Sequence, residues 1–288
     1  MIDPSELVLN TNGSIYHLAL KPENIANKII IAGDPGRIET ISNLFDSIDC
    51  KIENREFVTH TGFYKGVRVT ALATGIGTDN IDIVLNELDA LVNIDLKKRE
   101  VKENHTKLEI VRIGTCGSIQ ESVPTDEVVV STHAFGLDGL MNFYEFAMNS
   151  EESKIHQEIL KQTSWDKSLN NPYLVKGSTD LIDKIGKGFN PGITITASGF
   201  YAPQGRKLRL SPRYPNLNES LRAFEFEGQR IVNYEMETSA LYGLSRLMGH
   251  DACTVCAVVA NRYANSFSKD YKPVIKSLIH DVLDRLTA

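Results

Sequence analysis

The chain lacks the features that define several large classes of protein. It has only four cysteines in 288 residues, too few for a scaffold held together by disulfides. No apolar run is long enough to cross a membrane as a helix, and the opening stretch from Met1 to Glu6 does not resemble a signal peptide. We therefore expect a cytoplasmic protein that does not use a membrane as a partner.

An excess of positive charge is also missing. The formal net charge is −6, which argues against a general nucleic-acid binder. Hydrophobic residues make up 42% and charged residues 24% of the chain, a composition typical of a globular protein with a sizeable core. Because no repeat, low-complexity segment or linker interrupts the sequence, we expect one domain over residues 1–288.

Short β-branched runs alternate with helical patterns along the chain. The predicted strands cover residues 28–32, 67–73, 108–113, 127–131, 192–197, 230–234 and 253–260. Apolar residues at helical spacing lie at residues 38–45, 81–91, 239–248 and 272–286. This alternation predicts an α/β fold with a central mixed, largely parallel sheet covered by helices. Since ligands of such sheets bind at the carboxyl ends of the strands, the turns after the first, second, third and sixth predicted strands should line one pocket.

Two of the cysteines form a C-x-x-C pattern, a spacing that occurs in metal and redox sites. Cys253 and Cys256 lie inside the last predicted strand, where positions three apart face opposite sides of the sheet. We interpret both as core residues and expect no metal site.

Two carboxylates lie where the sixth predicted strand meets the helix that follows it. Glu235 and Glu237 flank Met236, so their side chains share one face if the alternation of the strand continues. An acid at the end of a core strand needs a partner or a polar task, because burial of an unpaired charge is costly. Taken alone, the pair fits a helix start, where negative charge suits the helix dipole, better than it fits a binding site.

Two other segments carry positive charge towards the predicted pocket. The turn Gly33-Asp34-Pro35-Gly36-Arg37 combines backbone N–H groups, a helix start and an arginine, which suits an oxyanion such as phosphate. It is also a common Asp-Pro-Gly turn. Arg112 lies within an otherwise apolar strand, where its charge requires either a carboxylate partner or an anionic ligand. The sequence leaves these alternatives open.

The turn Thr74-Gly75-Ile76-Gly77 resembles the start of a dinucleotide-binding fingerprint. The third glycine of that fingerprint is missing, since position 80 is Asn80. The acids at a suitable distance, Asp95 and Glu100, belong to a charged surface segment and do not follow a predicted strand. An NAD-type oxidoreductase is therefore a hypothesis of a different class that has little support.

Three segments together resemble the signature segments of nucleoside phosphorylase family I. They are Gly33-Asp34-Pro35-Gly36-Arg37, Arg112-Ile113-Gly114-Thr115-Cys116-Gly117 and Tyr234-Glu235-Met236-Glu237-Thr238. Their order and spacing agree with the family from about Tyr16 to the last helix. A fourth segment, Phe200-Tyr201-Ala202-Pro203-Gln204-Gly205-Arg206, fits the Phe-x-x-x-Gln-x-Arg pattern of base recognition in uridine phosphorylases. The resemblance is therefore closest to that branch, and it implies a nucleoside phosphorylase-like fold.

The resemblance implies a role for each part of the site. Phosphate would be bound by Gly33, Arg37, Arg55, Arg112 and Thr115, and the ribose by His17, Thr115, Met236 and Glu237. The base would be bound by Phe200, Gln204 and Arg206, with Arg262 near a uracil carbonyl. A glutamine amide and a guanidinium together can satisfy the carbonyl and N–H groups along the edge of uracil. Glu235 would instead be a structural partner.

The implied reaction is the reversible phosphorolysis of uridine to uracil and ribose 1-phosphate in nucleoside salvage. Deoxyuridine and thymidine are further candidate substrates. Arg37, Arg55 and Arg112 would clamp the attacking phosphate. Arg206, Gln204 and Arg262 would stabilise the departing uracil anion. Such a pentosyltransferase uses phosphate as a substrate and needs no cofactor.

Sister activities of the superfamily are the alternatives. Purine phosphorylases place an aspartate after the last core strand, where this chain has Val259-Ala260-Asn261-Arg262 without an acid. Nucleosidases use water and do not need the phosphate arginines. A non-catalytic nucleoside-binding protein would not need them either.

The resemblance implies that two of these residues act in a neighbouring subunit. The family's counterparts of Arg55 and His17 reach across an interface, so the resemblance implies a homo-oligomer, either a dimer or a hexamer. Some bacterial relatives bind a monovalent cation there through a glutamate, present here as Glu56, and a serine. The place of that serine holds Asn80 or Thr78, which argues against the cation.

Overall fold

The β-branched runs form the strands that the sequence predicts. In the computed structural model, which describes residues 1–288, β1 (Lys28–Ala32) and β4 (Val67–Ala73) have the predicted bounds. The others begin or end a few residues from the predicted bounds: β7 (Glu109–Ser118), β8 (Val128–Gly136), β10 (Asn190–Thr196), β12 (Gln229–Glu235) and β13 (Asp251–Asn261). Periodicity therefore located seven of the strands of the central sheet.

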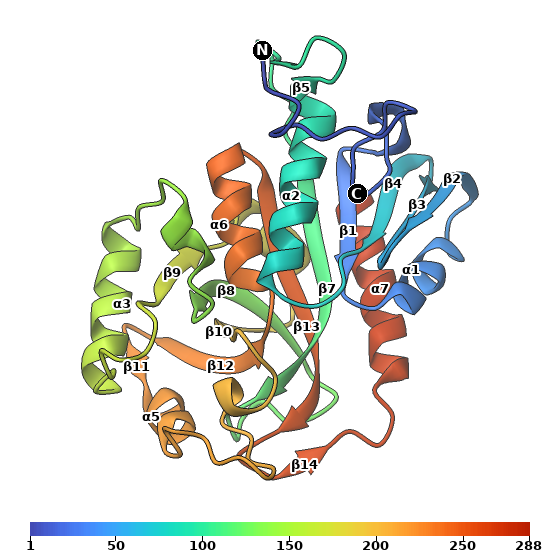
Figure 1. Ribbon diagram of the computed structural model, residues 1–288. Helices are drawn as coiled ribbons and strands as arrows, with labels where there is room; N and C mark the ends of the chain where they lie inside the picture. The colour runs from blue at the N-terminus through green and yellow to red at the C-terminus, as the bar shows by residue number, and fades with distance from the viewer.

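Parallel pairings form the centre of a 12-stranded mixed sheet. β1 lies parallel to β4 and β7, β13 lies parallel to β7, and β10 lies parallel to β8 and β12. The antiparallel pair β2 (Ser47–Asn54) and β3 (Phe57–Tyr64), which the sequence analysis missed, extends the sheet beyond β4 (Figure 1). Short antiparallel strands are added at β9 (Tyr173–Lys176), β11 (Glu225–Phe226) and β14 (Ser266–Phe267). The expected α/β fold with a mixed sheet is confirmed.

Five strands of this sheet close into a ring, which the sequence analysis did not predict. The order is β7, β13, β8, β10 and β12, and the antiparallel pairing of Tyr234 with Gly117 joins β12 back to β7. Register shifts at Gly192 in β10 and at Val258 in β13 mark irregularities along two of these strands. Such bulges increase the twist and bend of a strand, and thereby help a sheet to close. Closure places the end of β7 beside the end of β12.

The segment Gly114–Ser118 is strand and not the turn that its glycines led us to predict. Its glycines serve close contacts instead. A Cβ on Gly114 would lie 2.8 Å from Sγ of Cys256, and one on Gly117 would lie 3.2 Å from Nε of Arg262. Both neighbours come from β13 or its carboxyl end, so the small residues let β7 and β13 run side by side to the rim of the sheet.

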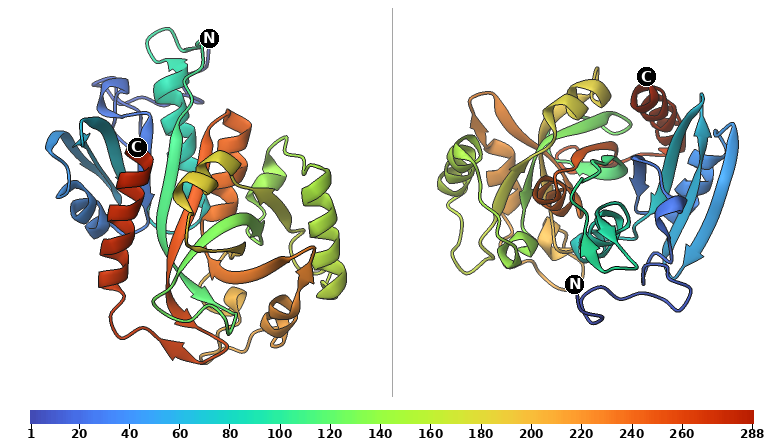
Figure 2. Two further views of the ribbon diagram at one scale, coloured as in Figure 1. Left: turned by 180° about the vertical axis from the view of Figure 1, so that it is seen from behind. Right: turned by 90° about the horizontal axis from the view of Figure 1, so that it is seen from above.

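Helices cover both faces of the sheet (Figure 2). α2 (Thr78–Asn93) and α6 (Thr238–Met248) contribute to one large apolar cluster. α1 (Pro35–Ser42), α4 (Thr179–Ile185) and α7 (Lys272–Thr287) contribute to a second. None of the helices is long and apolar enough to span a membrane.

Alternation along the strands explains why both faces are apolar. Ile29 and Ile31 of β1 join the first cluster, whereas Ile30 joins the second. Cys253 and Cys256 follow the same rule, because both are fully buried and they belong to different clusters. This confirms their interpretation as core residues.

Smaller elements surround the closed ring. α3 (Ser150–Gln162) and α5 (Leu217–Ala223) pack on a third apolar cluster that includes residues of β10 and β12. β5 (Ile94–Asp95) and β6 (Glu100–Val101) form a separate hairpin. The 3₁₀ helices are η1 (Pro22–Asn24), η2 (Leu140–Phe143) and η3 (Ala202–Gln204).

Candidate active site

A cavity of about 980 Å³ opens at the carboxyl ends of the central strands. The turns after β1 and β4, the second half of β7, the ends of β12 and β13 and the loop after β10 all reach it. All four segments that the sequence assigned to one pocket meet here, which confirms their convergence, although the third of them is the second half of β7 and not a turn. The lining includes Gly33, Arg37, Ile76, Arg112, Thr115, Phe200, Gln204, Arg206, Asn218, Tyr234, Met236, Glu237 and Arg262.

Arg112 is buried, with 4% of its surface exposed, and it pairs with two carboxylates. Its Nη1 lies 3.3 Å from Oε2 of Glu235, and its Nη2 donates to Oε2 of Glu237. Burial disfavours the charge, but the carboxylates of Glu237 and Glu235 outweigh this and raise the pKa of Arg112 above its ordinary value. The glutamates therefore share one face, as predicted, and Arg112 both has carboxylate partners and lines the cavity.

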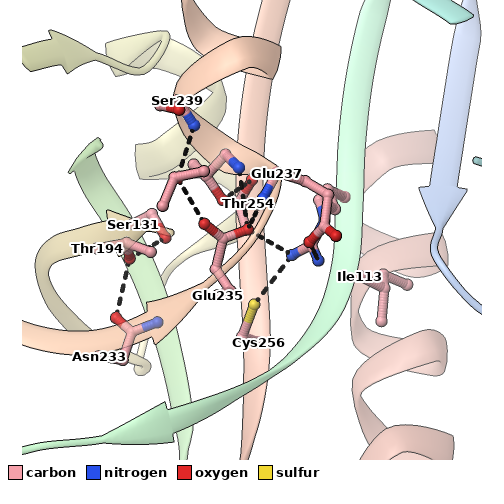
Figure 3. Close-up of polar contacts among 12 residues, drawn as sticks. Ile113, Ser131, Thr194, Asn233, Glu235, Glu237, Ser239, Thr254 and Cys256 are labelled. Carbon is pink, nitrogen blue, oxygen red and sulfur yellow. Dashed lines mark hydrogen bonds and ion pairs between the residues drawn. The ribbon is translucent and has the colours of Figure 1, made fainter. Parts of the chain in front are cut away.

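Glu235 holds the beginning of α6. Its Oε2 accepts the backbone N–H groups of Glu237 and Thr238, both at 2.9 Å, and its Oε1 accepts the hydroxyl of Thr196 at 2.6 Å (Figure 3). These bonds satisfy free N–H groups of the first helical turn, which is where a carboxylate stabilises a helix. The helix-start interpretation is thus correct for Glu235, while its ion pair with Arg112 adds a second task.

Glu237 connects two of the strand-end turns. Its Oε1 accepts the backbone N–H of Gly77 at 2.8 Å, and its Oε2 is bound to Arg112. Gly77 has a φ of +101°, in the region that favours glycine, and it precedes the first residue of α2. The carboxylate therefore ties the turn after β4 to the end of β12, and it lines the cavity between them.

The same contact argues against dinucleotide binding. In a dinucleotide fingerprint the glycine turn presents its N–H groups to a pyrophosphate, whereas the N–H of Gly77 already binds a protein carboxylate. Asp95 belongs to the β5–β6 hairpin, where it accepts the N–H groups of Lys97 and Lys98. It does not follow a strand of the central sheet.

The turn after β1 brings Arg37 against β7, next to Arg112. Nη1 of Arg37 donates to the carbonyl oxygen of Ile113 at 2.9 Å. Burial and the neighbouring charge of Arg112 lower the pKa of Arg37, because two like charges that lie close together disfavour each other. The side chain of Asp34 accepts the N–H of Gly36 at 2.9 Å, so one N–H that the sequence offered to phosphate is already used.

The base-recognition segment gathers around the amide of Gln204. Its Oε1 accepts from Nη1 of Arg206 at 2.6 Å and from Nη2 of Arg262 at 2.5 Å. The guanidinium of Arg206 also lies over the ring of Phe200, 3.7 Å from the ring centre, as in a cation–π contact. Gln204 is almost fully buried, whereas half of Phe200 is exposed.

No carboxylate accompanies these two arginines. Burial lowers the pKa of Arg206. Burial and then the charge of Arg206 lower the pKa of Arg262 to about 10. The end of the cavity that holds Gln204 is therefore strongly electropositive, in contrast to the neutralised surroundings of Arg112.

Two predicted site residues do not reach this cavity within one chain. Nδ1 of His17 lies 2.7 Å from Oε1 of Glu87, whose carboxylate also accepts the backbone N–H groups of His17 and Leu18. His17 lines a separate cavity of about 360 Å³. Arg55 is exposed, and its Nη2 donates to the hydroxyl of Tyr16 at 3.3 Å. The role of these two residues in a neighbouring copy of the chain stays a prediction.

Sequence reasoning gave no role to two polar residues of the lining. The hydroxyl of Tyr234 donates to Oδ1 of Asn218 at 2.8 Å, and Nδ2 of Asn218 donates to the carbonyl oxygen of Gln204 at 3.2 Å. Tyr234 lay inside a recognised segment, but a lone asparagine near the start of a short helix carries no sequence signal.

Metal ligation has no visible basis in the side chains. No group of three or more His, Cys, Asp or Glu residues is arranged to hold a metal ion. The question of a monovalent cation near Glu56 stays a prediction, because it concerns an interface between chains.

Comparison with known proteins defines the class. The chain matches the phosphorylase superfamily over residues 27–285, and it therefore belongs to that superfamily.

Individual relatives include enzymes for both types of base. A uridine phosphorylase of Thermococcus kodakarensis is 30% identical over 257 residues, which cover 89% of this chain and 81% of the relative. A DeoD-type purine nucleoside phosphorylase of Colwellia psychrerythraea is 25% identical over 243 residues, or 84% of this chain and 85% of the relative. Among solved structures, a Trypanosoma brucei nucleoside phosphorylase described as showing uridine phosphorylase activity is 31% identical, with a TM-score of 0.89 over 98% of this chain and 99% of that one.

Proposed function

We propose that this protein is a uridine phosphorylase, a pentosyltransferase that converts uridine and phosphate reversibly into uracil and ribose 1-phosphate. One observation carries the proposal: Gln204 shares its amide oxygen with Arg206 and Arg262, and no carboxylate neutralises them. A pyrimidine that leaves as an anion would be stabilised there. The names of the Thermococcus kodakarensis and Trypanosoma brucei relatives support the same choice.

The middle of the cavity suits a ribose. Glu237 presents a fixed carboxylate that can accept hydrogen bonds from sugar hydroxyls, and Met236 offers an apolar contact. Arg112 holds this carboxylate and leaves little freedom for it to turn. Fixed acceptors of this kind reduce the ordering cost of binding and orient the substrate for reaction.

Phosphate would lie beside Arg37 and Arg112, with Gly33 and Thr115 as further contacts. Its attack on the sugar carbon adds a C–O bond as the bond to the base nitrogen breaks, and the electron pair of that bond leaves with uracil. Positive charge on the sugar ring would face the phosphate dianion, while negative charge on uracil would face Arg206 and Arg262. Neither a covalent enzyme intermediate nor a cofactor takes part in this reaction.

Gln204 would read the pyrimidine edge through its amide. Because its Oε1 already accepts from two guanidiniums, its N–H₂ group is left to donate to a uracil carbonyl. The N–H of uracil would then require one guanidinium to shift as the base enters, which frees a lone pair on Oε1.

Purine phosphorolysis is the second candidate, favoured only by the DeoD-type relatives. A purine N7 needs a proton donor at the end of β13, where this chain has Asn261. The amide of Asn261 donates to the carbonyl oxygens of Gln120 and Val123 at 2.8 and 3.0 Å, so its hydrogens are used in the fold. This arrangement supports a pyrimidine substrate over a purine.

The active enzyme would be a homo-oligomer whose sites are shared between subunits. The position of His17 and Arg55 outside their own cavity supports this arrangement. Dilution should abolish activity together with the mass of the dimer in mass photometry. A proven monomer with full activity would contradict the shared site.

The test of the main proposal follows uridine absorbance with and without inorganic phosphate. We expect uridine to disappear only when phosphate is present, and ribose 1-phosphate plus uracil to restore it. Loss of uridine without phosphate would instead indicate a nucleosidase, and no loss in either case would reject the proposal. Adenosine, inosine, deoxyuridine and thymidine in the same assay measure the preference for base and sugar.

A further inference from the structure

The segment that carries Gln204 and Arg206 has few connections to the rest of the fold. Within the segment, the backbone N–H groups of Gln204 and Arg206 both donate to the carbonyl oxygen of Tyr201, at 3.0 and 2.9 Å. Nη1 of Arg206 donates to the carbonyl oxygen of Phe200 at 2.6 Å. These bonds shape a local turn, but they do not fix where that turn lies relative to the sheet.

Side chains from outside the segment make that connection through Gln204. Arg262, at the end of β13, donates to both the carbonyl oxygen and the side-chain oxygen of Gln204. Asn218, in α5, donates from Nδ2 to the same carbonyl oxygen at 3.2 Å. Asn218 lines the cavity as Arg262 does, but it carries no charge and both ends of its amide bond protein groups, so its main task is positioning.

The orientation of the Asn218 amide follows from its partners. A backbone carbonyl oxygen can only accept, so the atom of Asn218 that faces Gln204 must be nitrogen. The other end is then the oxygen, and it accepts the hydroxyl of Tyr234 at 2.8 Å. The two bonds join the base-recognition segment to β12, where Tyr234 is almost fully buried.

The helix that bears Asn218 is itself anchored. α5 contacts β12 (Figure 1), and Leu221 and Phe224 at its carboxyl end are fully buried in the same apolar cluster as Tyr234. Asn218 therefore fixes the position of the loop that carries Gln204 relative to the closed ring.

Gly205 shows how tightly the two parts meet. A Cβ at this position would lie 2.5 Å from Nδ2 of Asn218, closer than real Cβ atoms approach. Gly205 also has a φ of +72°, which favours glycine. The backbone between Gln204 and Arg206 is thus pressed against the amide of Asn218.

We propose that Asn218 is a positioning residue for base recognition: it holds Gln204, and through it Arg206, at the place where the departing base develops its charge. This inference rests on the proposed phosphorolysis of uridine. Asn218 acts through these neighbours and has no contact with phosphate residues, so its loss should affect the base and leave phosphate binding unchanged.

The experiment compares Asn218→Ala and Asn218→Asp with a matched control, Asn216→Ala. Asn216 is exposed at the start of the same helix and makes no side-chain capping bond. We expect Asn218→Ala to lower kcat/KM for uridine about tenfold, the effect of a lost neutral hydrogen bond that positions another group. The KM for phosphate should stay at the wild-type value.

Asn218→Asp separates positioning from simple loss of packing. The carboxylate keeps the volume and the acceptor for Tyr234, but it turns a second acceptor and a negative charge towards the carbonyl of Gln204. It should therefore lower kcat/KM for uridine at least as much as Asn218→Ala, with a melting temperature close to that of the wild type. This near-isosteric variant also carries the test if Asn218→Ala does not fold.

A double-mutant cycle with Gln204→Ala measures whether Asn218 acts through Gln204. Gln204→Ala keeps the backbone carbonyl that Asn218 binds but removes the side chain that would read the base. In this background the additional change Asn218→Ala should therefore cost much less kcat/KM than it does alone. Additive losses, a kcat/KM for both Asn218 variants within about twofold of Asn216→Ala, or an equal rise in the KM for phosphate would overturn the inference. If wild-type protein shows no phosphate-dependent loss of uridine, it is the proposed function that fails.

Discussion

The two ends of the cavity handle positive charge in opposite ways. Arg112 is buried between the carboxylates of Glu235 and Glu237, so its charge is compensated before any substrate arrives. Arg206 and Arg262 share only a neutral amide oxygen, and their charge remains available to the substrate. The first arrangement orients groups, and the second supplies the electric field that stabilises an anion.

The two ends also differ in how they are built. Arg112 and Glu235 lie in strands of the closed ring, Glu237 is the N-cap residue of α6, and all three are buried. Arg206 instead lies in a loop beside half-exposed Phe200 and Tyr201. A rigid sugar end and an adaptable base end would let the same core serve different bases. Substitutions at the ring should therefore affect stability and activity together, and substitutions of loop side chains that leave the backbone unstrained should affect activity alone.

The largest expected effect follows the loss of Arg112. Arg112→Met leaves two buried carboxylates without a counter-charge, which should lower the free energy of unfolding by about 3–5 kcal/mol in urea titrations and abolish turnover. Lys28→Met is the matched control, because Lys28 pairs with Glu109 at the partly exposed start of β1 and should cost only about 1 kcal/mol or less. Similar losses for both variants would break the distinction between the buried and the exposed ion pair.

Loss of Arg206 should raise the barrier of the reaction without unfolding the protein. If its guanidinium acts like one donor of an oxyanion hole, Arg206→Ala should lose about 2.7–4 kcal/mol of transition-state stabilisation, measured as kcat for uridine. Its melting temperature should match that of Arg209→Ala, a control at an exposed position of the same loop. A parallel loss of stability and activity would show that the loop belongs to the rigid core.

A substitution at Gly205 can separate the effect of backbone strain from the effect of displacing Asn218. Gly205→Ala and Gly188→Ala both place a side chain at positive φ, +72° and +83°, at a cost of about 1–2 kcal/mol each. Only a Cβ at Gly205 meets Asn218, whereas the space around Gly188 is open. Thermal unfolding should respond to both changes, and turnover of uridine only to the first. Equal turnover would show that the loop adjusts freely.

The smallest effect concerns pH. The pKa of Arg262 is lowered to about 10, while that of Arg112 is raised, so increasing pH removes the charge of Arg262 first. The activity ratio of wild type to Arg262→Met should therefore fall as pH rises through about 10, by about fivefold if a charged hydrogen bond becomes a neutral one. Ionisation of uridine affects both enzymes and cancels in the ratio. A constant ratio between pH 8 and about 10.5 would contradict the low pKa.

The sequence predicted the parts of the site that depend on local pattern. The strand-end turns could be placed in one pocket because parallel strands bring their carboxyl ends to the same edge. The shared face of Glu235 and Glu237 followed from strand alternation, and both do contact Arg112. Resemblance to a family supplied roles that no periodicity contains, such as that of Gln204.

Sequence periodicity could not predict pairings between residues that lie far apart in the chain. The join of Tyr234 to Gly117 pairs residues that lie far apart in the sequence. The glycines of β7 looked like a turn because their neighbours on β13 were unknown. β2 was missed because most of its residues are exposed and polar. Asn218 was missed for a related reason, since only the folded chain brings α5 against the loop that carries Gln204.

The closed ring also predicts which strands open locally and which do not. Every strand of the ring has a hydrogen-bonded neighbour on each side. None of them can therefore separate from the sheet without breaking its hydrogen bonds to two strands. β2, at the outer edge, has a single neighbour. Deuterium exchange should therefore reach the amides of β2 long before those of β7 and β13, whose hydrogen bonds should open only when the central sheet unfolds.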